Sequence, residues 1–217
     1  SSGKSSAIIR QHYSNEVTAR MALQSLRVFQ NFEEEVGGES GFTQAGFLVL
    51  VPEKDIEGLR ANLVMQRRVG IQTDLLTQDE LRHRWPFLET GDLVAAAYEP
   101  EAGYADPNLT LNAYAQAAKK RGAAIFQETE VTGVRFSGGR VTGVDTTKGP
   151  FDAPLVLNCA GPWGARVARM AGCETPINAC RVQVAFFRRP AGHESPHPVV
   201  VDFTHAVYWR PDTGGLT

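Results

Sequence analysis

The chain alternates short apolar runs with amphipathic stretches, and this pattern predicts both strands and helices. Over residues 15–36 apolar side chains recur every three or four positions, which predicts one long helix. The predicted apolar face of that helix carries Val17, Met21, Val28, Phe29, Phe32 and Val36. Residues 53–69 show the same spacing and are followed by Gly70, so a second helix is expected there. The continuous apolar runs 47–51 and 93–98 predict buried strands.

Three local signals mark where further elements begin. The segment Thr77-Gln78-Asp79-Glu80 is a capping box, which predicts a short helix that stops before Pro86. Asp106-Pro107 is typical of a helix start, with a cap followed by proline at the first helical position. The glycine-containing turn 137–139 separates two alternating runs, which predicts a β-hairpin.

A short apolar run, Leu155-Val156-Leu157-Asn158, predicts a strand that breaks at Ala160-Gly161. A helix over residues 163–171 is expected to follow at once. Strands and helices thus alternate while hairpins interrupt the pattern. This order predicts a mixed α/β protein with two interleaved layers, and argues against a purely parallel sheet.

Composition and charge narrow the classes of function. Of the 217 residues, 42% are hydrophobic, which is enough for a packed core. The 22 Lys and Arg residues nearly balance the 24 Asp and Glu residues, and this near balance argues against a nucleic-acid partner. No apolar run reaches the length of about 18 residues that a membrane span needs, so none is predicted.

The three cysteines, Cys159, Cys173 and Cys180, form an odd set without C-x-x-C spacing. They predict neither a disulfide framework nor a zinc site, and no metal is expected. Free thiols favour a reducing compartment, so we expect a cytoplasmic protein.

Both ends of the sequence are unusual for a complete protein. There is no initiating Met, and the chain opens inside a Gly/Ser-rich loop. It closes at residues 208–217, which read as a strand, a turn and the start of a second strand. We therefore expect this sequence to be the middle of a longer protein.

Three segments carry candidate chemistry. The opening loop Ser1–Arg10 offers hydroxyl and backbone N–H donors that suit an anion, although a plain Ser/Gly linker has the same composition. The segment "LVLNCAGPWG" (155–164) would let a ligand approach the backbone closely, unless its glycine serves only a tight strand-to-helix turn. The segment "EPEAGYADP" (99–107) reads as a well-made loop and helix start.

These segments, in this order, resemble the flavin amine oxidoreductases of the D-amino-acid oxidase superfamily. The closest resemblance is to the branch of sarcosine and dimethylglycine oxidases and dehydrogenases, including the β subunit of heterotetrameric sarcosine oxidase. The matching stretches are "SSGKSSAIIRQHYS", "EPEAGYADP", "ETEVTGV", "LVLNCAGPW" and "YWRPDTGG". The resemblance implies part of an FAD-binding, Rossmann-like domain (1–40 and 105–175) interleaved with part of an antiparallel-sheet substrate domain (41–104 and 176–217).

The resemblance also implies roles for individual residues. Arg10 matches an arginine that pairs with the substrate carboxylate, and Tyr208 matches a tyrosine on the substrate-domain sheet above the flavin. Contacts with FAD are implied for the opening loop, for the adenine-binding valine and for the strand-to-helix turn. These residues are Ser1, Ser2, Gly3, Ser5, Ser6, Val131, Ala160, Gly161 and Trp163.

The implied activity is the FAD-dependent oxidation of a small secondary or tertiary amino acid such as sarcosine or dimethylglycine. A hydride equivalent would pass to the flavin and leave an imine that water hydrolyses. The G-x-G-x-x-G turn of the family is not in this sequence, so we expect the isolated chain to bind FAD weakly or not at all and to be inactive.

Two other readings remain open. The chain could be a non-catalytic subunit or an interaction piece of a flavoprotein complex. It could also belong to a glycerol-phosphate or other hydroxy-acid dehydrogenase on the same fold, although no basic patch for a phosphate accompanies Arg10. The expected partners are a small amino-acid substrate and, in a complex, other flavoprotein subunits.

Overall fold

The computed structural model describes residues 2–192, 196–212 and 217. The chain divides into two compact units, which are taken one at a time below. The larger unit contains Ser1–Ala123 and Phe186–Thr217, and the smaller unit contains Ala124–Ala185.

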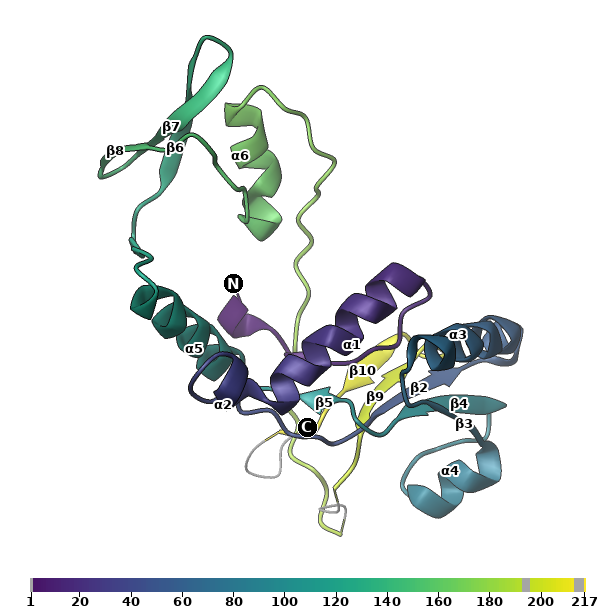
Figure 1. Cartoon of the computed structure of the whole chain (residues 1–217). Coiled ribbons are helices and arrows are strands. Elements are labelled where there is room, and N and C mark those ends of the chain that lie inside the picture. The colour runs from purple at the N-terminus through teal and green to yellow at the C-terminus, as the bar shows by residue number, and fades with distance from the viewer. Residues whose placement is uncertain (1, 193–195, 213–216) are drawn as a thin grey trace. The chain divides into compact units, whose positions relative to one another are not determined.

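A five-stranded sheet forms the centre of the larger unit (Figure 1). Its strand order is β10 (Val207–Trp209), β9 (Val199–Asp202), β2 (Phe47–Val51), β4 (Ala95–Glu99) and β3 (Asp74–Thr77). All neighbours are antiparallel except β2 and β9, which run parallel. Every residue of β2 is buried, because this strand has a neighbour on each side and a layer on each face. The expected strands at 47–51 and 93–98 are thus confirmed, the second beginning two residues later than expected.

Each face of the sheet packs against a different helix. Phe47, Val49 and Val51 point to the face covered by α3 (Ile56–Val69) and cluster with Leu59 and Leu63 of that helix. The alternating residues of β2 point to the opposite face and cluster with Leu81 of α4 (Gln78–Arg84). This alternation is the side-chain period of a strand that is buried on both faces.

The expected helix over 15–36 is present but breaks at Asn31 into α1 (Glu16–Gln30) and α2 (Phe32–Glu35). Its predicted face was wrong in part, since Val17 and Met21 are 67% and 66% exposed. The buried residues of α1 are instead Ala19, Leu23 and Leu26. Both sets follow a helical spacing, and the packing of Ala19 and Leu23 against Ile71 selects the second.

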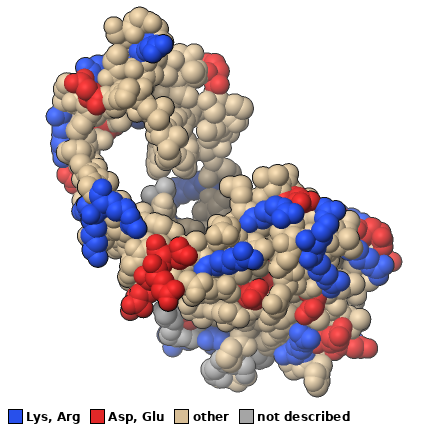
Figure 2. Space-filling view, in the orientation of Figure 1, with Lys and Arg blue, Asp and Glu red and all other residues tan. Residues whose placement is uncertain are grey.

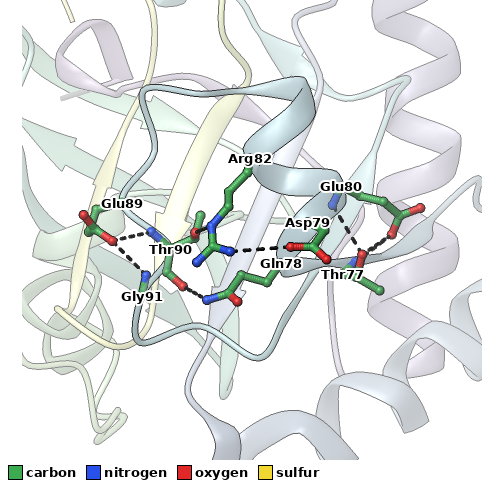
Figure 3. A network of polar contacts seen from close by, with 8 residues as sticks. All are labelled: Thr77, Gln78, Asp79, Glu80, Arg82, Glu89, Thr90 and Gly91. Carbon is green, nitrogen blue, oxygen red and sulfur yellow. Dashed lines mark hydrogen bonds and ion pairs between the residues drawn. The ribbon is translucent and has the colours of Figure 1, made fainter.

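The capping box at α4 is confirmed and extends into a larger polar network (Figure 3). Glu80 accepts a hydrogen bond from the Thr77 backbone N–H at 2.7 Å, and the Thr77 hydroxyl oxygen accepts from the Glu80 N–H at 3.3 Å. Arg82 donates from Nε to the buried hydroxyl of Thr90 at 2.9 Å. A carboxylate oxygen of Glu89 accepts from the backbone N–H groups of Thr90 and Gly91. The network fixes the loop after α4 to the helix.

A close approach of three backbone segments positions the start of the chain. Strand β1 (Ile8–Ile9) pairs with β5 (Gly103–Tyr104), and Thr43 bridges to Tyr104 on the other side. A Cβ atom on Gly103 would lie 2.0 Å from the Thr43 carbonyl oxygen, so only glycine fits there. Helix α5 (Pro107–Lys120) follows, and Asp106 caps it as expected. The short 3₁₀ helix η1 (Ser2–Lys4) packs on α5.

The smaller unit contains a three-stranded antiparallel sheet, β6 (Val131–Ser137), β7 (Arg140–Thr146) and β8 (Gly149–Asp152). The expected hairpin is confirmed in β6 and β7. Helix α6 (Gly164–Met170), preceded by the 3₁₀ helix η3 (Gly161–Trp163), packs on β6, and Arg166 forms an ion pair with Glu130 at 2.7 Å. Of residues 124–185, all of which the structure describes, only Gly143 and Gly164 are buried.

The expectation of a strand at Leu155–Asn158 was wrong, because these residues form no strand. Leu155 and Leu157 are 81% and 83% exposed. A strand needs a neighbour for its backbone N–H and C=O groups, and no described strand pairs with this run. An apolar sequence alone is therefore not enough to form a strand here.

The mixed α/β class is confirmed by these elements. On the visible surface Lys and Arg side chains are interspersed with Asp and Glu side chains (Figure 2). Within the part of the chain that the structure describes, no helix combines the length and the apolar character needed to cross a bilayer.

Candidate functional site

Arg10 follows β1 directly and lines a cavity of about 550 Å³ in the larger unit. Its guanidinium carbon lies 4.3 Å from the ring centroid of Tyr13 and 5.8 Å from that of Phe47. One guanidinium nitrogen, Nη1, donates to the backbone carbonyl of His12. Among the described residues no carboxylate lies within ion-pair distance of Arg10. Within the described part of the chain, Arg10 donates to one carbonyl, so several of its N–H groups remain available to a ligand.

A second arginine of the same unit makes a useful contrast. Arg210 lies 4.5 Å from the ring centroid of Tyr104, in a setting similar to that of Arg10. It already forms an ion pair with Asp212 at 3.7 Å. Of these two arginines on aromatic rings, Arg10 is the one placed to accept a carboxylate from outside the chain.

Tyr208 lies on the same face of the five-stranded sheet as Val49. In the sheet register Tyr208 is directly opposite Val201, which is directly opposite Val49. Residues directly opposite each other point to the same side of a sheet. Val49 and Val201 line the cavity of Arg10, whereas Tyr208 does not, and its side chain is 45% exposed. Tyr208 therefore lies on the sheet face of the Arg10 cavity but is not part of its lining.

The opening loop presents polar groups to solvent. Ser2, Lys4 and Ser5 are exposed, and the Ser5 hydroxyl also accepts a hydrogen bond from the Ala7 N–H at 3.0 Å. Gly3 and Ser6 are half-buried. A Cβ atom on Gly3 would lie 2.5 Å from Oδ1 of Asn108, so this glycine also serves the packing of η1 on α5. Ser1 lies outside the described residues.

Two largely buried titratable side chains, Glu99 and His12, lie near Arg10. Glu99 ends β4, and no part of its side chain is exposed. Its Oε2 accepts from the Gln11 backbone N–H at 2.9 Å, and its Oε1 lies 3.7 Å from Nδ1 of His12. Burial raises the pKa of Glu99 to about 7, against the lowering effect of the Gln11 hydrogen bond and the Arg10 charge. Burial, and then the Arg10 charge, lower the pKa of His12 to about 4.

Glu99 is a functional candidate that sequence reasoning missed. The segment 99–107 was expected to be only a loop and a helix start. One signal was present in the sequence, namely a glutamate directly after the apolar run 93–98, which predicts a buried strand. An acid at the end of a buried strand is rarely buried unless it is paired.

The remaining predicted site residues belong to the smaller unit. Val131 begins β6, and a register shift between Val131 and Gly133 interrupts the ladder with β7. Ala160 precedes η3, and Gly161, with φ +54°, has open space where a Cβ atom would point. The Trp163 side chain is 57% exposed. The predicted residues thus form two groups, the opening loop with Arg10 and Tyr208 in one unit and these four in the other.

The chemistry of these residues suits a ligand that carries phosphates, a ribose and rings. Hydroxyls and an ammonium of the opening loop could bind an anion. The open backbone at Gly161 and the exposed indole of Trp163 could receive a sugar or a ring. Among the described residues there is no group of three or more His, Cys, Asp or Glu side chains that could hold a metal ion.

Comparison with known proteins gives a consistent result. A family model described as "DAO: FAD dependent oxidoreductase" matches residues 1–217. The chain is 32% identical over 189 residues to human mitochondrial sarcosine dehydrogenase, a match that covers 84% of this chain and 20% of that protein. It is 29% identical over 208 residues to sarcosine oxidase subunit beta of Arthrobacter sp., covering 93% of this chain and 51% of that protein.

Among solved structures, L-proline dehydrogenase from P. horikoshii matches with a TM-score of 0.84 and 26% identity. That match covers 100% of this chain and 58% of the solved one. The chain therefore spans about half the length of the Arthrobacter protein and a fifth of the human one.

Proposed function

Because this chain belongs to the DAO family of FAD-dependent oxidoreductases, we propose that the protein oxidises a small secondary or tertiary amino acid whose carboxylate pairs with Arg10. The resemblance to the D-amino-acid oxidase superfamily, with sarcosine-oxidising relatives, is confirmed by the family match and by these relatives. FAD, the expected cofactor, is that of the family.

One observation carries the substrate proposal. Arg10 lines a cavity, lies against two aromatic rings and has no carboxylate partner among the described residues. A partly buried cation without a counter-ion is costly, and a substrate carboxylate would supply the missing charge. The planar guanidinium fork can bind both oxygens of such a carboxylate.

The names of the relatives narrow the substrate class. Sarcosine and L-proline, the substrates named for them, are both small secondary amino acids with a carboxylate next to the carbon that carries nitrogen. Binding the carboxylate at Arg10 would fix the position of that carbon relative to the protein. Sarcosine and dimethylglycine are the substrates that we propose, and Tyr208 on the same sheet face is proposed as a second site residue.

The residues present fit FAD in their chemistry. We assign Ser1, Ser2, Gly3, Ser5 and Ser6 of the opening loop to contacts with the diphosphate and the flavin ring. Val131 is assigned to the adenine, and Ala160, Gly161 and Trp163 are assigned to the ribose and diphosphate. When bound, FAD would supply the two-electron oxidation of the C–N bond, whose imine product water hydrolyses.

The two predicted domains are assigned by the ligand that each is proposed to bind, whereas the two compact units described above are defined by their packing. Residues 1–40 and 105–175 are proposed to serve the cofactor, and residues 41–104 and 176–217 the substrate. As in the Arthrobacter relative, which is named as a subunit, further flavoprotein subunits are proposed partners. The three cysteines are free and exposed, which supports the proposed cytoplasmic location.

The test is the visible absorption of the natural full-length protein, mixed without oxygen with sarcosine, dimethylglycine or L-proline. We expect flavin bands that bleach with at least one of these amino acids and persist with glycolate or glycerol 3-phosphate. Bleaching by the hydroxy compounds alone would favour a hydroxy-acid dehydrogenase. A protein that takes up no flavin, even when FAD is added, would favour the non-catalytic alternative.

A further inference from the structure

Glu99 is a buried carboxyl group that the proposed reaction does not use. Its side chain is fully buried at the end of β4, directly opposite Phe47 of β2. An apolar side chain would fill this position at lower cost if packing were its only task. Its Oε2 accepts a hydrogen bond from the Gln11 N–H at 2.9 Å, and the His12 backbone also interacts with this carboxyl group.

That hydrogen bond fixes the peptide group next to Arg10, because the Gln11 N–H belongs to the peptide that joins the two residues. From the other side, Gln66 of α3 donates from Nε2 to the carbonyl of Tyr13 at 3.1 Å. Between these two anchors the His12 carbonyl accepts from Nη1 of Arg10. The guanidinium is therefore oriented by a backbone segment, residues 11–13, that Glu99 and Gln66 hold in place.

We propose that Glu99 is a positioning residue that determines how tightly the substrate carboxylate binds, because it holds the backbone segment that orients Arg10. The proposal rests on the role of Arg10 in the proposed function. Glu99 would touch neither the substrate nor the cofactor. It acts through the Gln11 amide, and Gln66 supports the same segment from α3.

The protonation of Glu99 gives this arrangement a second consequence. The charged or titratable groups that face it are Arg10 and His12, while Gln66 on α3 and Phe47 on β2 are neutral. Nδ1 of His12 lies 3.3 Å from Nε2 of Gln66, so a neutral His12 can accept from that amide. Oε1 of Glu99 lies 3.7 Å from Nδ1 of His12, so the histidine ring is the side chain next to this oxygen. Ionisation of Glu99 would add a negative charge near Arg10 and oppose the binding of an anion.

The experiment compares carboxylate and amine ligands in the natural full-length protein. Acetate carries only the carboxylate of sarcosine, and dimethylamine carries only its amine. Their dissociation constants are measured by calorimetry in the wild type, Glu99→Ala, Glu99→Gln and Arg10→Ala, with the exposed Arg60→Ala as the matched control. Calorimetry reports binding without turnover.

We expect Glu99→Ala to weaken acetate binding about tenfold or more, and dimethylamine binding less than about threefold. Glu99→Gln can still accept from the Gln11 N–H and should remain near the wild type at pH 6. Above pH 7 the wild type should lose acetate affinity as Glu99 ionises, whereas Glu99→Gln should not. The pH comparison tests the charge of Glu99. If Glu99→Ala does not fold, Glu99→Met, which fills the site but cannot accept from the Gln11 N–H, takes its place with the same expected weakening.

Equal weakening of both ligands by Glu99→Ala, or acetate binding that none of the Glu99 variants changes at any pH, would overturn the proposal. Arg10→Ala separates this failure from that of the proposed function. If Arg10→Ala weakens acetate binding and Glu99→Ala does not, only the role of Glu99 is wrong. If Arg10→Ala has no effect either, the carboxylate site itself is wrong.

Discussion

Two apolar runs of similar sequence differ in burial: the run in the larger unit is buried, and the run in the smaller unit is exposed. Leu48 and Leu50 of β2 are 0% and 2% exposed, whereas Leu155 and Leu157 of the smaller unit are 81% and 83% exposed. Strand β2 has a paired neighbour on each side and a helix over each face. Among the residues that the structure describes, no strand pairs with residues 155–158, and Leu155 and Leu157 remain exposed. Burial thus depends on the partners that the rest of the chain supplies, and only the larger unit supplies them.

The difference in burial between these two runs predicts the largest loss of stability for a substitution in the core of the sheet. Leu48→Ala should lower the free energy of unfolding of the 217-residue chain by about 2–5 kcal/mol, because it removes a fully buried side chain. Leu157→Ala is the matched control, and it should change that free energy by less than about 0.5 kcal/mol. Chemical denaturation of both variants measures the difference. Equal losses would show that residues 155–158 are buried after all.

The buried acid behind Arg10 should give an effect that depends on pH. Burial raises the pKa of Glu99 from its usual 4.5 to about 7, so the folded state holds this proton more tightly than the unfolded state. The stability that this group contributes is complete below pH 4.5 and is lost as pH rises through 7. Glu99→Gln removes this loss.

The free energy of unfolding of Glu99→Gln, relative to the wild type, should therefore rise by about 3 kcal/mol at most between pH 4.5 and pH 8. His12, whose pKa is lowered, has the opposite pH dependence, but it is present in both proteins and cancels in the comparison. Urea denaturation at a series of pH values measures the change. A difference that stays constant with pH would mean that Glu99 titrates normally in the fold.

A smaller loss of stability is expected when a helix loses the side chain that caps its N-terminus. Asp106 caps α5 by accepting from the N–H groups of Asn108 and Leu109, at 2.7 and 2.9 Å, whereas α6 in the smaller unit has no side-chain cap. Asp106→Ala should cost about 1 kcal/mol of stability. Asp106→Asn, which can still cap, should cost less, and thermal unfolding of the two variants separates them.

Several elements of the larger unit could be predicted from local signals in the sequence, and the packing of the unit agrees with them. The capping box at Thr77 and the cap at Asp106 each give the expected helix, because hydrogen bonds within a few residues decide them. The run 47–51 gives the expected strand because its continuous apolar sequence suits a strand that is buried on both faces. The buried face of α1 was mistaken in part because two helical stripes were available and only contact with Ile71 selects one. The missing strand at 155–158 has the same origin, since pairing is not a local property.

The candidate site likewise contains one residue that the sequence identified and one that only the structure identified. Arg10 was found through a motif, and the structure adds that it has a cavity and no carboxylate partner among the described residues. Glu99 was not found, although its position directly after an apolar run was a signal in the sequence. Its burial comes from the meeting of β4 with residues 11–13, which are far away in the sequence.

The most direct test of the account is the affinity for sarcosine of Arg10→Ala in the natural full-length protein, measured from flavin reduction without oxygen. Loss of a charge-assisted, partly buried contact should weaken sarcosine binding by about 100-fold, with Arg10→Lys intermediate and Arg60→Ala unchanged. An Arg10→Ala protein that binds sarcosine as tightly as the wild type, while Arg60→Ala behaves normally, would contradict the carboxylate site at Arg10.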